Sequence, residues 1–175
     1  VRRLSFGGGE PTLSKHLVDY VRVAASLGIE DVEIITNAVL LDTKEKVEPL
    51  AKAGLRRAFV SLHAHDELLS RRLTSKVGDW DKTVRGIDQL VAHGVLTEVN
   101  HVISTVNYPY LPRFADLVLD RWKGEVGVSF AFVTPQFRAL ENAWLIPKMS
   151  DVVPYLRVAM RKLALGRVRF VVGSR

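Results

Sequence analysis

The chain has no cysteine among its 175 residues, and this absence excludes several kinds of site. Disulfides need paired thiols, while iron–sulfur clusters and many structural zinc ions need thiolate ligands. None of these groups can be held by cysteines of this chain.

Long apolar runs are absent too. No stretch approaches the ~18 consecutive apolar residues that a membrane-spanning helix requires, and no secretory signal pattern opens the chain. We therefore expect a cytoplasmic protein with no membrane partner. The net charge of +6 permits an anionic partner. A content of 47% hydrophobic and 25% charged residues fits one globular domain over residues 1–175.

Both ends of the chain lie within strand-like patterns. Val1 opens inside such a run without a methionine, and residues 167–175 form another run with no helix after it. We therefore expect a fragment that lacks material at both ends.

Short β-branched runs alternate with amphipathic stretches along the chain. Two of the amphipathic stretches are followed by Gly28 and Gly94, the residue type that most often ends a helix. Strands that alternate with helices form parallel sheets, so this α/β pattern fits either a (β/α) barrel or a doubly wound sheet. The expected strands are 2–6, 32–36, 57–63, 96–104, 126–132 and 168–172, and the expected helices are 17–27, 84–93, 111–118 and 152–163.

Two helix starts carry capping signals. Asp79 is expected to cap the helix that ends before residue 94. Asp42 with Glu45 resembles a capping box, but Pro49 would disrupt a helix interior. That helix is therefore expected to begin at Glu48 or to bend there.

Residues 6–12, Phe-Gly-Gly-Gly-Glu-Pro-Thr, form the most informative motif. Consecutive glycines let the backbone approach a ligand closely and adopt positive φ. Glu10 then places a carboxylate at the end of the strand, and Pro11 stiffens the exit. This combination suits an ammonium group held by a carboxylate and by bare backbone carbonyls. The glycine spacing matches neither a P-loop nor a dinucleotide fingerprint.

Polar residues recur at the carboxyl ends of five successive expected strands. Both α/β architectures bind ligands at that edge, so these residues indicate a shared site. Ser61, His63 and His65 alternate with Leu62, which places the three on one face. The residues singled out at these ends are the glycines Gly8 and Gly9 and the polar residues Glu10, Thr36, Asn37, Ser61, His63, His65, Asp66, Glu67, Asn100, His101, Asn107, Thr134 and Gln136.

In this order the motifs resemble the core of the radical S-adenosylmethionine (radical SAM) superfamily. The resemblance implies a partial (β/α)6 barrel of the TIM type, truncated at both ends, without the first strand and its cluster-binding loop. It covers residues 1–117 and is carried by residues 4–13, 35–37, 60–65, 72–74, 84–94 and 99–103 and by Asn107.

The resemblance also implies the cofactors, S-adenosylmethionine and a 4Fe–4S cluster. In the family, the reduced cluster cleaves S-adenosylmethionine to a 5′-deoxyadenosyl radical, which abstracts hydrogen from a substrate, so the implied activity is that of an oxidoreductase. Gly8, Gly9 and Glu10 would meet the methionine amino end. The other implied cofactor-binding residues are Thr36 and Asn37 toward the nucleoside, Ser61 and Asn100 near ribose or carboxylate, and His63.

The family holds its cluster with three cysteines upstream of the Gly-Gly-Glu strand. Because this chain has none, the ligands are expected upstream of residue 1, and no residue here is expected to bind metal. The fragment alone is therefore expected to be inactive. The resemblance further implies an electron donor such as flavodoxin or ferredoxin, and a substrate that the sequence does not identify as small molecule, peptide or RNA.

Two other functions stay open from the residues alone. His63, His65 and His101, with Asp66 nearby, could hold zinc in a metal-dependent barrel hydrolase. Basic clusters could instead form a non-enzymatic nucleic-acid binding surface, although aromatic residues are not interleaved with them. These clusters are Arg56-Arg57, Arg71-Arg72 and the group Arg157, Arg161, Lys162, Arg167 and Arg169.

Overall fold

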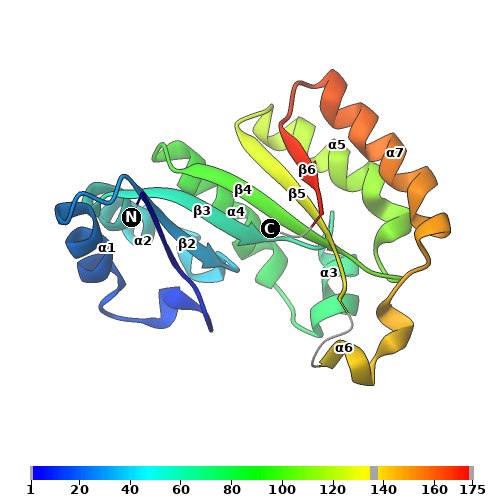
Figure 1. Ribbon diagram of the computed structural model, residues 1–175, viewed down its shortest axis with the longest axis horizontal. Helices are drawn as coiled ribbons and strands as arrows, with labels where there is room; N and C mark the ends of the chain where they lie inside the picture. The colour runs from blue at the N-terminus through cyan, green and yellow to red at the C-terminus, as the bar shows by residue number, and fades with distance from the viewer. Residues whose placement is uncertain (1, 135–137, 174–175) are drawn as a thin grey trace. The chain divides into compact units, whose positions relative to one another are not determined.

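The computed structural model describes residues 2–134 and 138–173, which form an α/β fold around one six-stranded sheet (Figure 1). The strands follow one another in the sheet in chain order, and the pairings β1–β2, β2–β3 and β5–β6 are parallel. The strands are β1 (Arg3–Phe6), β2 (Asp31–Thr36), β3 (Leu55–Ser61), β4 (Leu96–Ile103), β5 (Val126–Phe132) and β6 (Phe170–Val172). This confirms the predicted fold class.

Helices connect successive strands. The α-helices are α1 (Leu17–Ser26), α2 (Lys44–Ala53), α3 (Glu67–Thr74), α4 (Asp79–Ala92), α5 (Leu111–Trp122), α6 (Arg138–Glu141) and α7 (Met149–Leu165). The short 3-10 turns are η1 (Pro11–Leu13), η2 (Val39–Leu41), η3 (Tyr108–Tyr110) and η4 (Ala143–Leu145). In the part of the chain that the structure describes, none of these helices combines the length and apolar character needed to cross a lipid bilayer.

Contacts divide the chain into two compact units. Unit 1 consists of Val1–Ser61 and Gly78–Val99. Its core lies between one face of β1, β2 and β3 and the helices α1, α2 and α4. The fully buried apolar side chains of this unit include Val21, Val32, Ile34, Val47, Val60, Ile87 and Leu90.

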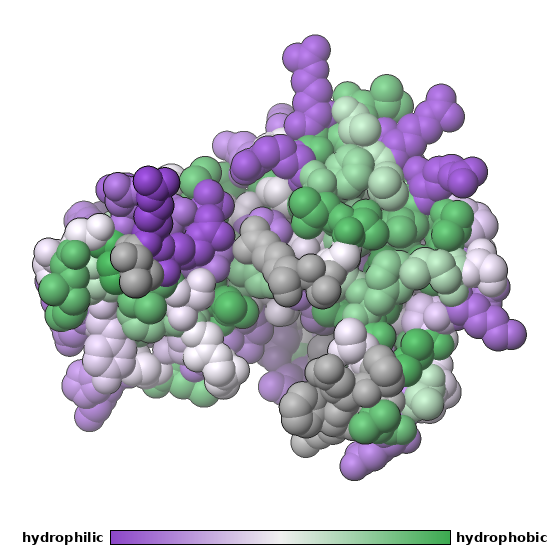
Figure 2. All heavy atoms as spheres, viewed as in Figure 1, coloured by the Kyte–Doolittle hydropathy of each residue, from purple (hydrophilic) through white to green (hydrophobic). Residues whose placement is uncertain are grey.

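Unit 2 consists of Leu62–Val77 and Asn100–Arg175. Helices α5 and α7 lie side by side in this unit and pack on each other (Figure 1). Helix α7 buries Val152, Leu156, Ala159 and Leu163, which repeat at helical spacing. Figure 2 shows hydrophilic side chains projecting beside hydrophobic ones over this part of the surface.

Most strand limits agree with the sequence prediction to within two residues. The range predicted for β5, 126–132, is confirmed. Strand β3 begins and ends two residues earlier than predicted, so His63 lies in the loop after the strand. Strand β6 is shorter than predicted, because the N–H of Val168 instead donates to the carbonyl of Leu163 at the end of α7.

The glycines predicted to end α1 and α4 are confirmed, whereas the two predicted helix caps are wrong. Gly28 and Gly94 have φ of +80° and +72° just after α1 and α4. The N-cap of α4 is Gly78, with φ 77°, and Asp79 is already the first helical residue. The predicted capping residue thus lies in the first turn, where its charge still favours the helix dipole.

Helix α2 begins at Lys44, before Pro49, so neither the predicted start at Glu48 nor the capping box of Asp42 with Glu45 is correct. The N-cap is Thr43, and Pro49 lies inside the helix. The apolar face formed by Val47, Leu50 and Ala53 is buried, and this packing outweighs the unfavourable proline. The sequence prediction also missed α3 and α6.

Candidate functional site

Glu10 lies at the carboxyl end of β1, and its carboxylate joins this end to that of β2. Thr36 Oγ1 donates to Glu10 Oε1 over 2.6 Å, and the N–H of Asn37 donates to Oε2 over 2.8 Å. Thr12 donates to Oε1 twice, from its N–H over 3.1 Å and from its Oγ1 over 2.7 Å. Because three of these four bonds fall on Oε1, Oε2 keeps room for a further donor.

The surroundings of Glu10 favour the ionised carboxylate. Partial burial raises the pKa of Glu10. The hydrogen bonds from Asn37, Thr36 and Thr12 lower it, and their combined effect is larger than that of burial. The net result is a pKa below the usual value of a glutamate. Glu10 therefore carries a negative charge at neutral pH, as an ammonium-binding site requires.

The loop after β2 holds the partners of Glu10 in place. Thr36 is only 3% exposed, and its Oγ1 accepts the N–H of Ala38 over 2.9 Å while donating to Glu10. Asn37 Oδ1 accepts the N–H of Val39, and the carbonyl of Asn37 accepts the hydroxyl of Thr83 from α4 over 2.9 Å. The single proton of Thr36 is thus committed to Glu10, whereas the side-chain amide of Asn37 keeps its donor hydrogens.

The glycine loop between β1 and Glu10 leaves its backbone uncovered. A Cβ at Gly7 would lie 3.3 Å from Ile35 Cδ1, so that position has little room for a side chain. Gly8 has φ +109°, a conformation that favours glycine. Among the described residues, nothing lies within 4 Å of the Cβ positions of Gly8 or Gly9, so a ligand can approach their backbone.

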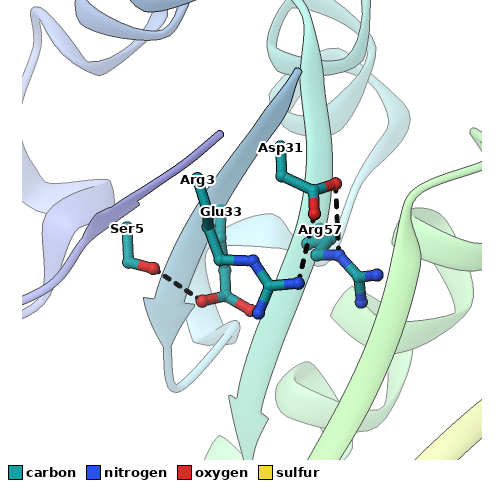
Figure 3. A network of polar contacts seen from close by, with 5 residues as sticks. All are labelled: Arg3, Ser5, Asp31, Glu33 and Arg57. Carbon is teal, nitrogen blue, oxygen red and sulfur yellow. Dashed lines mark hydrogen bonds and ion pairs between the residues drawn. The ribbon is translucent and has the colours of Figure 1, made fainter. Parts of the chain in front are cut away.

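A polar network covers the sheet face opposite the helices of unit 1, near the amino ends of its strands (Figure 3). The carboxylate of Asp31 lies between two guanidinium groups and accepts from Arg3 over 3.1 Å and from Arg57 over 3.3 Å. Ser5 donates to Glu33 over 2.6 Å. The hydrogen bond from Arg3 is the main cause of the lowered pKa of Asp31. These cross-strand contacts fix the register of β1 on β2 and so the position of Glu10.

A second group of polar residues lies in unit 2, around Asn107. Asn107 is 1% exposed and its side chain makes four hydrogen bonds. Its Nδ2 donates to the carbonyls of His63 and Val102, and its Oδ1 accepts from the N–H and Oγ of Ser104. Asn107 therefore ties the loop after β3 to the end of β4.

His63 is a neutral donor with a fixed tautomer. Its Nδ1 accepts the N–H of Val102 over 3.1 Å, so the ring proton lies on Nε2. Burial among protein atoms lowers the pKa of His63 to about 4. The imidazole is half-buried, and a backbone hydrogen bond at Asn100 partly opposes the effect of burial on its pKa.

His101 belongs to the core of unit 2. It is 1% exposed, its Nδ1 lies 3.1 Å from the carbonyl of Leu62, and its ring packs on Phe114 at 4.1 Å between centroids. Burial, followed by the nearby His63, lowers the pKa of His101 to about 3. His101 is therefore a neutral packing residue that joins β4 to the segment after β3.

The zinc hypothesis is not supported. Within residues 2–134 and 138–173, no group of three histidine, aspartate or glutamate side chains could hold a metal ion. His101 faces the aromatic core, because residues alternate along β4 and its neighbours Asn100 and Val102 lie on the other face. The nucleic-acid hypothesis is also weakened, because two of the basic residues in its clusters form ion pairs with carboxylates. Arg57 pairs with Asp31, and Lys162 pairs with Asp116 over 2.6 Å.

The structure thus brings together part of the predicted site in each unit. In unit 1, Glu10, Thr36 and Asn37 are in direct contact, with Gly8 and Gly9 just before them. Ser61, at the end of β3, and Asn100, on β4, are half-buried with side chains that no described residue engages. Ser61 lies in unit 1, and His63 and Asn100 lie in unit 2.

Sequence reasoning missed the residues that hold this site. Thr12 was not assigned a role, although a hydroxyl two residues after an acid at a strand end is a turn signal. Asn107 was noticed only as a polar residue, and its four bonds to backbone and Ser104 depend on the fold of the chain. Ser104 itself carried no signal.

Comparison with known proteins identifies the first two-thirds of the chain. A family model described as the radical SAM superfamily matches residues 1–118. A probable GTP 3′,8-cyclase from Methanopyrus kandleri is 36% identical over 121 residues, which are 69% of this chain and 38% of that protein. One from Saccharolobus solfataricus is 34% identical over 118 residues, 67% of this chain and 37% of the relative. The chain thus spans less than two-fifths of the length of these relatives.

Solved structures show the same fold at low identity. A domain of pyruvate-formate lyase-activating enzyme from Bacteroides vulgatus superposes with a TM-score of 0.73 at 14% identity, covering 98% of both chains. Coproporphyrinogen III oxidase from Escherichia coli, described as a radical SAM enzyme, gives a TM-score of 0.62 at 16% identity, covering 95% of this chain and 41% of that one. These structures share the partial barrel architecture predicted for this chain.

Proposed function

Because this chain belongs to the radical SAM superfamily, we propose that it forms the S-adenosylmethionine-binding part of an enzyme that cleaves this cofactor reductively. The observation that carries the proposal is the bonding of Glu10 to Thr36 and Asn37 at the carboxyl ends of two neighbouring strands. Ligands of parallel α/β folds bind at that edge. The matched residues 1–118 include all three of these side chains.

The methionine amino group is the part of the ligand that fits unit 1. An ammonium has three N–H donors and needs acceptors around it. Glu10 Oε2 has accepted only the N–H of Asn37, and the open space at Gly8 and Gly9, just before Glu10 in the chain, lets a ligand approach their backbone. Thr36 acts indirectly in this proposal, because its hydroxyl holds Glu10 and has no proton left to donate.

The remaining predicted residues supply donors of other kinds. Asn37 keeps its side-chain amide hydrogens, and His63 keeps a neutral Nε2–H. We assign Asn37, Ser61 and Asn100 to ribose or carboxylate oxygens of the ligand, and His63 to an oxygen of cofactor or substrate. None of these groups carries a formal charge, so they contribute orientation rather than strong attraction.

The residues of this chain do not fit the 4Fe–4S cluster that the family uses. Such clusters are held by cysteine thiolates, and this chain contains none. The described residues also contain no trio of other side chains that could replace them. We therefore place the cluster ligands outside these 175 residues. When bound, the cluster supplies the electron for cofactor cleavage, which it receives from a donor protein such as flavodoxin or ferredoxin.

The test is cofactor cleavage by the complete protein. The protein is reconstituted anaerobically with iron and sulfide, reduced with dithionite and given S-adenosylmethionine, and 5′-deoxyadenosine is quantified. We expect this product from the wild type and at least ~10-fold less from Glu10→Gln, which loses the charge that binds the ammonium. The matched control is Glu30→Gln, an exposed residue in the turn after α1, which should behave as wild type. No product from the reconstituted wild type would overturn the proposal.

A second, narrower candidate is the cyclisation of GTP. It is supported by the names of relatives that are 36% and 34% identical to this chain over about two-thirds of its length. The same reduced protein is incubated with GTP and S-adenosylmethionine, and GTP consumption is compared with that of ATP. Selective loss of GTP supports this substrate, and equal stability of both nucleotides excludes it.

A further inference from the structure

A strained turn lies next to Glu10 in unit 1. Ala38 has φ +57°, a backbone conformation that is unfavourable for any residue with a Cβ. Among the described residues, three other non-glycine residues share a positive φ, and each is exposed near the end of a helix, where this conformation is common: Ser75, Lys123 and Arg167. Ala38 instead lies in the loop after β2 and is 0% exposed. Its surroundings must therefore hold it in this conformation.

The turn carries the amide groups that orient Glu10. The N–H of Asn37 donates to Glu10 Oε2 over 2.8 Å. The N–H of Ala38 donates over 2.9 Å to the hydroxyl oxygen of Thr36, which itself donates to Glu10 Oε1. If the turn relaxed to a negative φ, both N–H groups would move away from these partners. The orientation of the carboxylate thus depends on the strained conformation of the turn.

Helix α4 packs against this turn through a hydroxyl and a glycine. Thr83 is 6% exposed, and its hydroxyl donates to the carbonyl of Asn37 over 2.9 Å. Gly86 is buried three residues later, on the same face of the helix. A Cβ at Gly86 would overlap the carbonyl oxygen of Ala38 and lie 3.0 Å from its Cβ. Because Gly86 lies inside a helix without a positive φ, the glycine serves this close approach rather than its own backbone.

We propose that Thr83 and Gly86 are positioning residues for the binding of the methionine amino group, because they hold residues 37–38 in the conformation that orients Glu10. The inference rests on the proposed function, in which Glu10 binds this ammonium. It gives a role to α4, a helix that supplies none of the residues assigned to the ligand. All the residues involved belong to unit 1.

Two substitutions disturb this contact in different ways. Thr83→Val nearly preserves the shape of the side chain and removes the hydrogen bond to the carbonyl of Asn37. Gly86→Ala favours the helix but pushes the carbonyl of Ala38 away. Thr83→Ser keeps the hydroxyl and should therefore restore the behaviour of the wild type.

Matched controls make the same chemical changes outside this turn. Thr97 is 3% exposed and donates its hydroxyl to the carbonyl of Val95 over 2.9 Å, so Thr97→Val also removes a buried bond to the backbone. A Cβ at Gly166 would overlap Leu119 Cδ2, so Gly166→Ala also introduces a clash. Both controls should be destabilising in urea, as their counterparts should be, so stability alone does not decide the question.

The measurement is the ratio of two affinities, one for S-adenosylmethionine and one for the analogue without the amino group. Both are obtained by equilibrium dialysis with the complete, anaerobically reconstituted protein. We expect wild type to prefer the natural cofactor by ~10-fold or more, and this preference to fall by ~3-fold or more in Thr83→Val and in Gly86→Ala. Thr83→Ser, Thr97→Val and Gly166→Ala should keep the preference of wild type. A loss of folded protein lowers both apparent affinities equally, so it leaves the ratio unchanged.

The outcomes distinguish this inference from the proposed function. A wild type that does not bind S-adenosylmethionine, or does not prefer it to the analogue, contradicts the proposed function itself. A wild type that prefers it, with the same preference in Thr83→Val, overturns only the role of α4. An equal fall in Thr97→Val or in Thr83→Ser also overturns that role, because the effect would not depend on the hydroxyl at the turn. If Gly86→Ala does not fold, Thr83→Val and its control decide the result.

Discussion

Glu10 and Thr36 lie 26 residues apart in the sequence, and the hydroxyl of Thr36 donates to Glu10 Oε1 over 2.6 Å. This bond crosses from the end of β1 to the end of β2, and a second bond from the N–H of Asn37 supports it. The carboxylate is therefore held in one orientation before any ligand arrives. Such preorganisation reduces the entropy lost when the ligand binds.

Thr36→Val removes this bond and nearly preserves the shape of the side chain. Thr36 is 3% exposed, so the methyl group of valine takes the place of the hydroxyl in a closed environment. We expect the free energy of unfolding to fall by about 1–3 kcal/mol and the affinity for S-adenosylmethionine to fall as well. Urea denaturation and equilibrium dialysis measure the two effects. Thr74→Val, which removes only exposed hydrogen bonds with Ser70 and Lys76 at the end of α3, is the control that should lower stability much less and leave the affinity unchanged.

Asn107→Ala should be among the most destabilising substitutions in unit 2. Its side chain makes four hydrogen bonds while only 1% of the residue is exposed. Because the backbone groups it serves would remain buried, we expect a loss of about 3 kcal/mol in urea denaturation. Ser26→Ala, which removes an exposed hydroxyl that donates to the carbonyl of Val23, should cost less than ~0.5 kcal/mol. Similar losses in the free energy of unfolding for the two variants would show that the buried hydrogen bonds of Asn107 do not stabilise unit 2 as proposed.

Stability should fall as the pH drops below 6.5, because buried histidines stay neutral in the folded protein. The pKa of His63 is lowered to about 4 and that of His101 to about 3, whereas both titrate at ~6.5 in the unfolded chain. Between these values the unfolded state binds more protons, so protons favour unfolding. The contribution of these neutral histidines to the free energy of unfolding is fully present above pH 6.5. It is lost as the pH falls toward their pKa values in the folded protein.

His101→Asn tests this linkage. Asparagine can still donate to the carbonyl of Leu62, but it does not titrate. Between pH 7 and pH 5, above the range in which most carboxylates titrate, we expect the variant to lose about 2 kcal/mol less stability than wild type. Urea denaturation at the two pH values measures the difference. Identical pH slopes for both proteins would show that His101 is not kept neutral by the fold.

The sequence predicted the elements whose signal is local. Strand β5 was predicted from its run of apolar residues. The ends of α1 and α4 were predicted from the preference of Gly28 and Gly94 for positive φ. Helix α3 was missed because it buries only Leu69, so the apolar repeat is too weak to detect. The start of α2 was wrong because the cost of Pro49 is visible in the sequence, whereas the burial that outweighs it is not.

The sequence predicted which residues belong to the candidate site, but not the hydrogen bonds between them. The motif at residues 7–10 located the carboxylate, and its place at a strand end follows from the α/β pattern. The sequence did not show that Thr36 serves Glu10 or that His101 lies in the core, because both depend on contacts between distant segments. The zinc hypothesis illustrates this, because the alternation along β4 turns His101 into the aromatic core.

The central claim is that Glu10 and the glycine loop bind the amino group of S-adenosylmethionine. The most direct measurement compares the affinity of the reconstituted protein for S-adenosylmethionine with its affinity for the analogue without the amino group, in wild type and in Glu10→Gln. We predict that wild type prefers the natural cofactor by ~10-fold or more and that Glu10→Gln loses most of this preference. A preference of the same size in both proteins would contradict the account.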